Sequence, residues 1–185
     1  IELRLVHAVR ILSRAGIAHA VARAYYSTDS DKVRELRAWV IDPRGEARRL
    51  GKGEALDVAL VGNDVYNEER VRLIDGSAEV ETGSVFGFES VVEGRSFFNQ
   101  VQWSFQSTLP VRRSRLELVL PPGWTIEAHI FTHPPLEPTR DGSSHTWELR
   151  ELPFLDDEPG APERNSLVPR VAVSYAPPAA ATPVE

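Results

Sequence analysis

The sequence contains no cysteine and no methionine. Without cysteine, the chain can form no disulfide framework, no thiolate metal site and no cysteine nucleophile. No apolar stretch approaches the roughly 18 residues that a membrane-spanning helix needs. A complete translation product starts with methionine, so we expect this chain, which starts at Ile1, to be a piece of a longer protein from which any signal peptide is missing.

Basic residues are fewer than acidic ones, with 21 Lys and Arg against 27 Asp and Glu and a formal net charge of −6. This balance argues against a nucleic-acid-binding protein, whose surface carries an excess of positive charge. Basic residues concentrate in 32–52 and acidic residues in 54–93. Such segregation either steers a charged partner or reflects charges that face each other across neighbouring strands.

Apolar and polar residues alternate along residues 97–120. Val101, Trp103 and Phe105 point one way in a pleated strand, and Leu116 and Leu118 repeat the pattern after Pro110. This period of two predicts two neighbouring antiparallel strands of a sheet with one face in solvent, over 97–106 and 112–120. Trp103 and Trp147 are expected in the core.

Similar patterns predict strands along most of the chain. The expected ranges are 3–12, 17–26, 33–41, 46–50, 70–74, 85–93, 97–106, 112–120, 124–133, 145–152 and 168–175. We therefore predict an all-β fold, an antiparallel β-sandwich of two packed sheets with about ten strands and at most one short helix. The sandwich domain would cover 1–175, and the Pro- and Ala-rich residues 176–185 would form a linker toward a missing C-terminal domain.

Turn signals divide these strands. The motif Asp42-Pro43-Arg44-Gly45 predicts a hairpin, because each residue type suits its position in a β-turn. Ser13-Arg14-Ala15-Gly16 predicts a turn that joins the first two strands in a hairpin, and Asp141-Gly142 marks another turn. Residues 54–70 are the least regular part and are expected to form a short helix or an ordered loop.

The sequence shows no convincing catalytic or metal-binding constellation. His129 and His133 lie about 13 Å apart on a straight strand, too far to share one metal ion with its ~2 Å bonds, and His145 follows later. The acidic run 156–158 lacks the spacing of a calcium-binding loop. There is no Gly-x-Ser-x-Gly elbow and no phosphate-binding glycine loop. We expect no cofactor, no metal and no enzymatic activity, with a carboxylate-dependent hydrolase as a remote alternative that would use Glu79, Glu81, Glu89 or Glu93.

A polar ladder opposite Trp103 provides the candidate binding surface. Its members are Gln100, Gln102 and Gln106, joined by Arg113 and Arg115 on the following strand. Glutamine ladders hydrogen-bond carbohydrates or added strands, although simple solvation explains the same pattern.

Several motifs, taken in order, resemble a bacterial family, the domain of unknown function that precedes transglutaminase-like domains in exported proteins. They are Asp42-Pro43-Arg44-Gly45, Thr82-Gly83-Ser84-Val85-Phe86-Gly87-Phe88, Trp103-Ser104-Phe105-Gln106 with Pro110-Val111 and Ser114, Pro121-Pro122-Gly123, Thr146-Trp147-Glu148-Leu149 through Leu152-Pro153, Glu158-Pro159, and Pro169.

The resemblance implies a β-sandwich module, export to the periplasm or cell surface, and a neighbouring transglutaminase- or peptidase-like domain that carries a Cys-His-Asp triad. No residue of this chain matches that triad. We therefore expect a non-catalytic accessory domain that docks against the C-terminal domain or presents substrate to it. The alternative is a module that binds cell-wall glycan or peptide.

Overall fold

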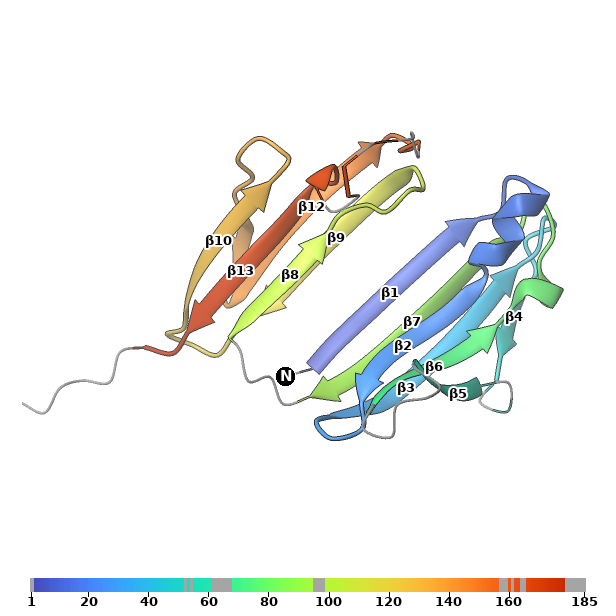
Figure 1. Ribbon diagram of the computed structural model, residues 1–185, viewed down its shortest axis with the longest axis horizontal. Helices are drawn as coiled ribbons and strands as arrows, with labels where there is room; N and C mark the ends of the chain where they lie inside the picture. Colours follow the sequence, from blue (N-terminus) through green and yellow to red (C-terminus); the bar gives the residue numbers. More distant parts are fainter. Residues whose placement is uncertain are drawn as a thin grey trace, which may run out of the picture. The chain divides into compact units, whose positions relative to one another are not determined.

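The predicted all-β class is confirmed (Figure 1). The computed structural model describes residues 2–51, 53, 55–60, 68–94, 99–156, 160, 162–163 and 166–178. Every strand pairing is antiparallel. The elements are β1 (Glu2–Arg10), the 3-10 helix η1 (Arg14–His19), β2 (Val21–Ser27), β3 (Asp31–Ile41), β4 (Ala47–Leu50), β5 (Ala55–Ala59), β6 (Glu69–Asp75), the 3-10 helix η3 (Ser77–Glu79), β7 (Val85–Gly94), β8 (Gln100–Ser104), β9 (Val111–Val119), β10 (Thr125–Phe131), β11 (Thr139–Asp141), β12 (Ser144–Leu152) and β13 (Arg170–Ala176).

The chain divides into two compact units, each built from two sheets. Unit 1 is Ile1–Phe97 and unit 2 is Phe98–Glu185. Unit 1 contains sheet A, with strand order β1-β7-β3-β4, and sheet B, with order β2-β6-β5. Unit 2 contains sheet C, with order β10-β13-β8, and sheet D, with order β11-β12-β9. Of the predicted linker, residues 179–185 lie outside the described residues.

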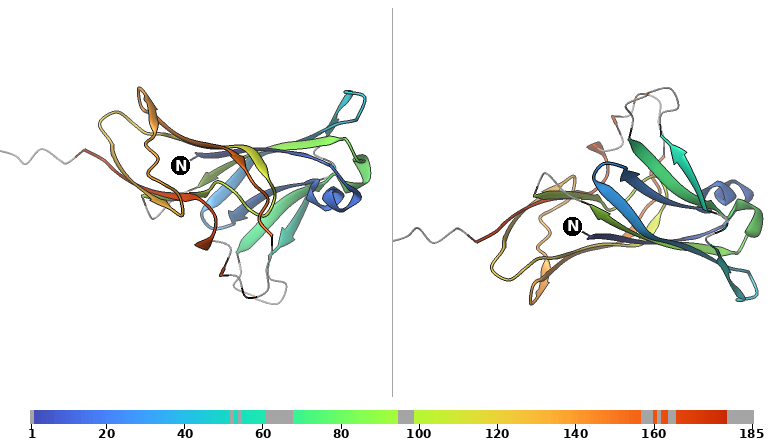
Figure 2. Two further views of the ribbon diagram at one scale, coloured as in Figure 1. Left: turned by 90° about the horizontal axis from the view of Figure 1, so that it is seen from above. Right: turned by 90° about the horizontal axis from the view of Figure 1, so that it is seen from below.

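The core of unit 1 lies between sheets A and B, which form two layers (Figure 2). Phe86 and Ile74 are fully buried and come from opposite sheets. A β-bulge between Val33 and Glu35 shifts the register of β3 against β7. The extra residue lets both Val33 and Leu36, which differ in parity, reach the interior.

Sheets A and B approach closely at Gly76. A Cβ atom at this position would lie 2.5 Å from Cε2 of Phe86 and 3.1 Å from Cδ1 of Leu50. Its backbone N–H donates to the carbonyl oxygen of Ala20 over 2.8 Å. Glycine is therefore required here because a side chain would not fit. Its φ of −100° is one that other residues also adopt.

Unit 2 has its own core between sheets C and D. Trp147 of β12 and Val171 of β13 are fully buried, and Trp103 packs against this cluster. Nε1 of Trp103 donates a hydrogen bond to Oγ of Ser114 over 3.1 Å, which joins the inner faces of the two sheets. The predicted core positions of Trp103 and Trp147 are confirmed.

The predicted pairing of 97–106 with 112–120 is wrong. β8 pairs with β13 in sheet C, and β9 pairs with β12 in sheet D. The segment between them crosses from one layer to the other, anchored by Phe105, whose N–H donates to the carbonyl of Pro169 over 2.9 Å. Both strands keep their alternation because each turns one face to the shared core, so the pattern predicts faces but not partners.

The predicted hairpin between the first two strands is also wrong. The Ser13–Gly16 turn forms, with the N–H of Gly16 bonded to the carbonyl of Ser13, but it continues into η1 through residue 19. β1 then pairs with β7 and β2 with β6, in different sheets. In the irregular stretch 54–70, residues 55–59 form strand β5, and residues 61–67 lie outside the described residues.

The hairpin between β3 and β4 forms as predicted. Oδ1 of Asp42 accepts hydrogen bonds from the backbone N–H groups of Arg44, over 2.8 Å, and Glu46, over 2.9 Å. Gly45 adopts φ of 91°, a conformation that glycine reaches without strain. The predicted turn at Asp141-Gly142 also forms, between β11 and β12.

Candidate functional site

The structure separates the five candidate surface residues into three places in unit 2. Gln100 and Gln102 are exposed on the outer face of sheet C. Arg113 and Arg115 lie on the outer face of sheet D, on the opposite side of the sandwich. Gln106 is buried at 7% exposure, where its amide donates to the carbonyl oxygens of Leu109 and Pro153. The predicted single polar ladder therefore does not form.

The arginines of sheet D are occupied by carboxylates of the same sheet. Arg113 and Arg150 both donate to Glu148, over 2.8 Å and 2.6 Å, and Arg115 donates to Glu117 over 2.8 Å. The hydrogen bonds from Arg113 and Arg150 lower the pKa of Glu148. Arg113 pairs with Glu148 across the two strands, whereas the other two ion pairs lie within one strand each; together they account for the charge of these residues without any ligand.

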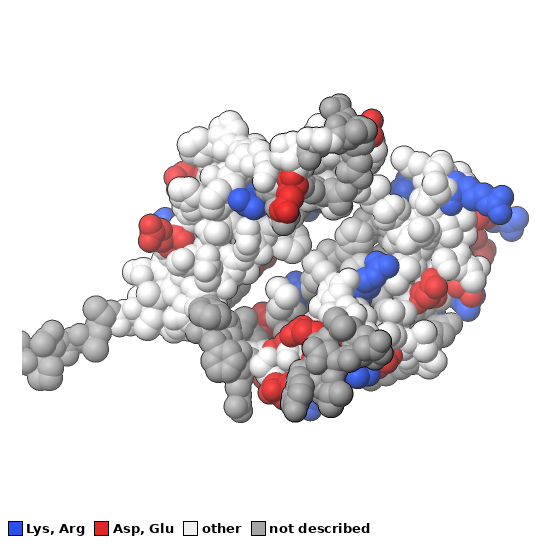
Figure 3. Space-filling view, viewed as in Figure 1, with Lys and Arg blue, Asp and Glu red and all other residues white. Residues whose placement is uncertain are grey.

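The outer face of sheet C is built differently. Its residues form three cross-strand rows, each running from β8 across β13 to β10. The face is turned toward the viewer in Figure 3, where few charged side chains interrupt it. Ala172 and Ser174 of the central strand are small, and side chains of β8 and β10 lie on either side of them. The rows are Ser104-Arg170-Phe131, Gln102-Ala172-His129 and Gln100-Ser174-Glu127.

Arg170 is the unusual member of this face. Its guanidinium carbon lies 4.5 Å from the centroid of the Phe131 ring, a cation–π geometry. The ring of His129 packs against the same phenylalanine, with centroids 4.8 Å apart. Arg170 is half-buried, and its Nε atom is fully enclosed without a hydrogen-bond acceptor among the described residues.

Sequence analysis missed this cluster. The alternation of Val171, Val173 and Tyr175 with Arg170 does place the arginine on the outer face of its strand. Its contact with Phe131 depends on the register of β10 against β13. Along the chain, β11 and β12 lie between these two strands. A single sequence carries no signal of that register.

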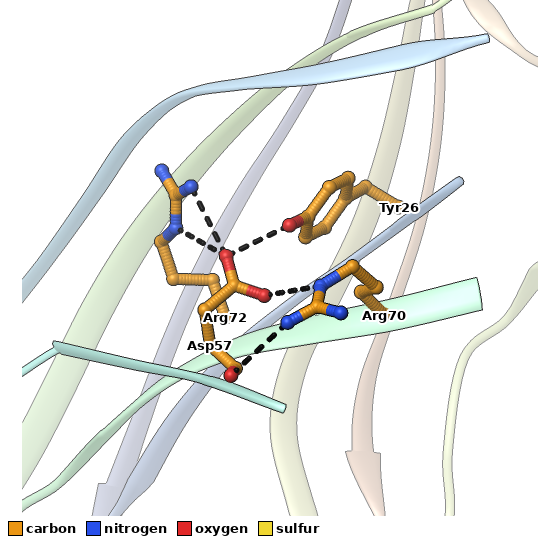
Figure 4. A network of polar contacts seen from close by, with 4 residues as sticks. All are labelled: Tyr26, Asp57, Arg70 and Arg72. Carbon is orange, nitrogen blue, oxygen red and sulfur yellow. Dashed lines mark hydrogen bonds and ion pairs between the residues drawn. The ribbon is translucent and has the colours of Figure 1, made fainter. Parts of the chain in front are cut away.

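Unit 1 contains a second arginine cluster, on the inner face of sheet B (Figure 4). Oδ1 of Asp57 accepts from Nε of Arg70 over 2.7 Å, and Oδ2 accepts from Arg72 over 3.2 Å and from the Tyr26 hydroxyl over 2.7 Å. Burial works to raise the pKa of Asp57, but the hydrogen bonds from Arg70, Tyr26 and Arg72 outweigh it, so the pKa is lowered. Every oxygen of this carboxylate has a donor, which is typical of a structural network.

Three of the four carboxylates considered for hydrolysis form ion pairs, and Glu81 lies in a turn where its backbone N–H donates to Oγ of Ser84 over 3.1 Å. Glu79 pairs with Arg48, and Glu93 pairs with Arg34. Glu89 of β7 pairs with Arg4 of β1 over 2.6 Å. The pairs of Glu89 and Glu93 join neighbouring strands, and the pair of Glu79 joins η3 to β4. Ion pairs at the protein surface contribute little to stability.

The three histidines are dispersed. His129 contacts Phe131 on the outer face of sheet C, whereas His145 lies in the interior, stacked near Trp147 with ring centroids 6.4 Å apart. Nδ1 of His133 lies 2.9 Å from the carbonyl oxygen of Pro134. Across the part of the chain that the structure describes, no three His, Asp or Glu residues gather where they could hold a metal ion.

Comparison with known proteins identifies the family. A family described as "Domain of Unknown Function with solved-structure structure (DUF3857)" matches residues 4–155. The chain belongs to the DUF3857 family. The match spans both units, so the part of unit 2 beyond residue 155, including β13, lies outside the matched DUF3857 residues.

One solved structure shares the fold of this DUF3857 chain. It is described as a "putative protease" from Parabacteroides distasonis ATCC 8503, with 14% sequence identity and a TM-score of 0.76. The alignment covers 94% of our chain but 36% of that protein, so the DUF3857 chain spans about a third of the structure that it resembles. No curated protein matches it. Among the described residues, no helix is long and apolar enough to cross a membrane.

Proposed function

We propose that this chain is a non-catalytic accessory domain of a longer protein, in which it docks against a C-terminal hydrolase-type domain or presents substrate to it. The partner domain would be transglutaminase- or peptidase-like, and the protein would act in the periplasm or outside the bacterial cell. One observation carries the proposal. The same fold occupies 36% of a longer chain that is described as a "putative protease", which leaves ample room there for a separate catalytic domain.

The side-chain chemistry of the described residues agrees with a structural or binding role. Asp57 and Glu148 are each held by two arginines, and Glu89 is paired with Arg4. General acid–base catalysis needs a carboxyl group that is free to approach a substrate with a pKa near the working pH. Asp57 and Glu148 instead have lowered pKa values, because arginine and tyrosine donors stabilise the charged form.

Isothermal titration calorimetry tests docking directly. The 185-residue chain is titrated with the separately expressed segment that follows it in the gene product. We expect saturable binding. Docking would be contradicted if no binding is measurable at high micromolar concentration and a mixture of the two segments is as active as the full-length protein.

A matched assay tests the absence of intrinsic activity. The 185-residue chain is incubated with chromogenic peptide and glycoside substrates, beside the full-length protein. We expect turnover only from the full-length protein. Turnover by the isolated chain that is abolished in a Glu79→Gln or Glu89→Gln variant would instead support the carboxylate-dependent hydrolase.

A peptide-binding role is the second candidate, and the outer face of sheet C favours it. This face combines exposed glutamine amides with Arg170, which has no acidic partner among the residues that the structure describes. Neutral glycans are usually bound by exposed aromatic rings and hydrogen bonds, whereas an unpaired guanidinium favours a ligand that carries negative charge.

A further inference from the structure

The three rows on the outer face of sheet C contain one arginine, Arg170, and no described carboxylate pairs with its guanidinium. The acidic residue of this face is Glu127, in the row of Ser174. Arg170 lies in the row of Phe131, four residues farther along β10, or about 13 Å at the rise of a β-strand. Glu127 is therefore too far away to form an ion pair with Arg170.

The setting of Arg170 differs from that of the arginines in the opposite sheet. Arg113 and Arg150 share Glu148, whereas no described residue accepts a hydrogen bond from the enclosed Nε of Arg170 or forms an ion pair with its guanidinium. A half-buried guanidinium has lost part of its hydration, and that loss is costly unless another group supplies an acceptor. Stacking on Phe131 offsets part of this cost and holds the guanidinium plane in one orientation.

An oriented guanidinium with unused N–H groups is suited to one class of partner. Its planar fork matches the two oxygens of a carboxylate, with which it forms two parallel hydrogen bonds. A phosphate is a poorer match, because a single arginine neutralises only about half of its charge. Ser104 and Gln102 flank Arg170 in the adjoining positions of β8, and both offer hydrogen-bond donors and acceptors to amide groups of a ligand.

The centre of the face leaves room for a chain to lie across it. Ala172 and Ser174 are the outward residues of the central strand, so no long side chain rises between β8 and β10 there. Gln100 and Gln102 are exposed along one border, and His129 and Glu127 lie along the other. A short peptide over this strip would meet amide and imidazole groups beyond its carboxylate.

We propose that the outer face of sheet C is a binding site for a peptide carboxylate, with Arg170 stacked on Phe131 as the group that holds the carboxylate. The site does not depend on the proposed accessory role, since a peptide can bind here whether or not the chain docks against another domain. Failure of the titration described next would leave the calorimetric docking experiment unaffected.

NMR titration of the 185-residue chain tests the site. The probes are N-acetyl-alanyl-alanine with a free C-terminal carboxylate, its C-terminal amide, N-acetyl-aspartate amide and inorganic phosphate. We expect the free acid to shift the Nε–H signal of Arg170 and the amides of β8, β10 and β13, with a dissociation constant in the millimolar range, and the C-terminal amide to bind at least about tenfold more weakly. The aspartate probe shows whether a side-chain carboxylate serves as well as a terminal one.

Matched variants locate the effect. Arg170→Lys keeps the charge but loses the planar fork, so we expect binding of the free acid to weaken about five- to tenfold. Phe131→Leu should weaken it about two- to fivefold through loss of stacking. Arg115→Lys, on the opposite face, should leave binding unchanged. Each variant is checked by the dispersion of its amide spectrum.

Three results would overturn the proposal. Equal binding of the acid and the amide to the wild-type chain would exclude recognition of the carboxylate, and this comparison needs no variant. Shifts confined to sheet D would place the site elsewhere. Tighter binding of inorganic phosphate than of any carboxylate probe would assign the site to a different ligand class.

Discussion

Arginine meets an aromatic ring in both units, with different consequences. In unit 1, Arg72 lies 5.9 Å from the centroid of the Tyr26 ring, and Asp57 accepts hydrogen bonds from both residues. In unit 2, Arg170 lies 4.5 Å from the centroid of the Phe131 ring, and no carboxylate among the described residues pairs with it. In the first cluster the arginines are paired with the carboxylate of Asp57. In the second, the guanidinium of Arg170 keeps N–H groups that can donate to a ligand.

The largest expected effect comes from truncating a core residue in each unit. Phe86 and Trp147 are fully buried in the cores of units 1 and 2. Phe86→Ala and Trp147→Ala should each lower the free energy of unfolding by about 3–5 kcal/mol. Hydrogen exchange should show lost protection first in β3 and β7 for Phe86→Ala, and first in β12 and β13 for Trp147→Ala. If either substitution lowers amide protection equally in both units, the two units unfold cooperatively and the contrast between them is lost.

Removing the shared carboxylate of unit 1 should have an intermediate effect. Asp57→Asn leaves Arg70 and Arg72 beside each other without a counter-charge, so we expect the free energy of unfolding to fall by about 1–2 kcal/mol. Urea denaturation at pH 7 measures the change. A Tyr26→Phe variant serves as a control that removes one neutral donor and keeps both ion pairs, and it should cost less. An Asp57→Asn protein as stable as the wild type would mean that the network is not structural.

Acid should reduce the contribution of the Asp57 carboxylate to the free energy of unfolding. The pKa of Asp57 is lowered in the folded chain, whereas an unfolded aspartate titrates near 3.9. Its stabilising contribution is therefore present above about pH 4 and is lost as the pH falls through the lower folded value. The stability difference between the wild type and Asp57→Asn should shrink when urea denaturation is repeated at pH 4 and pH 3. A difference that grows in acid would contradict the lowered pKa.

The smallest stability change is expected at Arg170. Arg170→Lys removes no ion pair and keeps the positive charge, so we expect the free energy of unfolding to stay within about 0.5 kcal/mol of the wild type. Thermal and urea unfolding measure this change beside Asp57→Asn. A loss as large as that of Asp57→Asn would make Arg170 a structural residue, and the contrast between the two clusters would disappear.

The sequence was informative about faces and turns. Period-two alternation correctly placed Trp103, Phe105 and Leu116 in the interior, because a strand sends neighbouring side chains to opposite sides whatever it pairs with. The hairpin at Asp42-Pro43-Arg44-Gly45 was predicted because its hydrogen bonds form among those residues and Glu46. Both features depend on local geometry alone.

Pairing and site geometry could not be read in the same way. β8 and β9 follow each other in the chain but lie in different sheets, a choice that is made by packing around Trp147 and Val171. Gln106 follows the polar parity of β8, yet it lies after the strand ends and turns into the interior. Arg170 and Phe131 meet through a register set by residues distant in sequence, which no local pattern encodes.

The position of β1 at the border of sheet A has a consequence for synthesis of the chain. Its partner in the sheet is β7, and about 75 residues separate the end of one strand from the start of the other. At a translation rate of about 5–20 residues per second, β7 leaves the ribosome about 4–15 s after β1. Throughout that interval, the nascent chain exposes Leu5 and Val9, which later pack against the core, beside unpaired backbone groups. This segment is therefore a target for a holding chaperone during that interval.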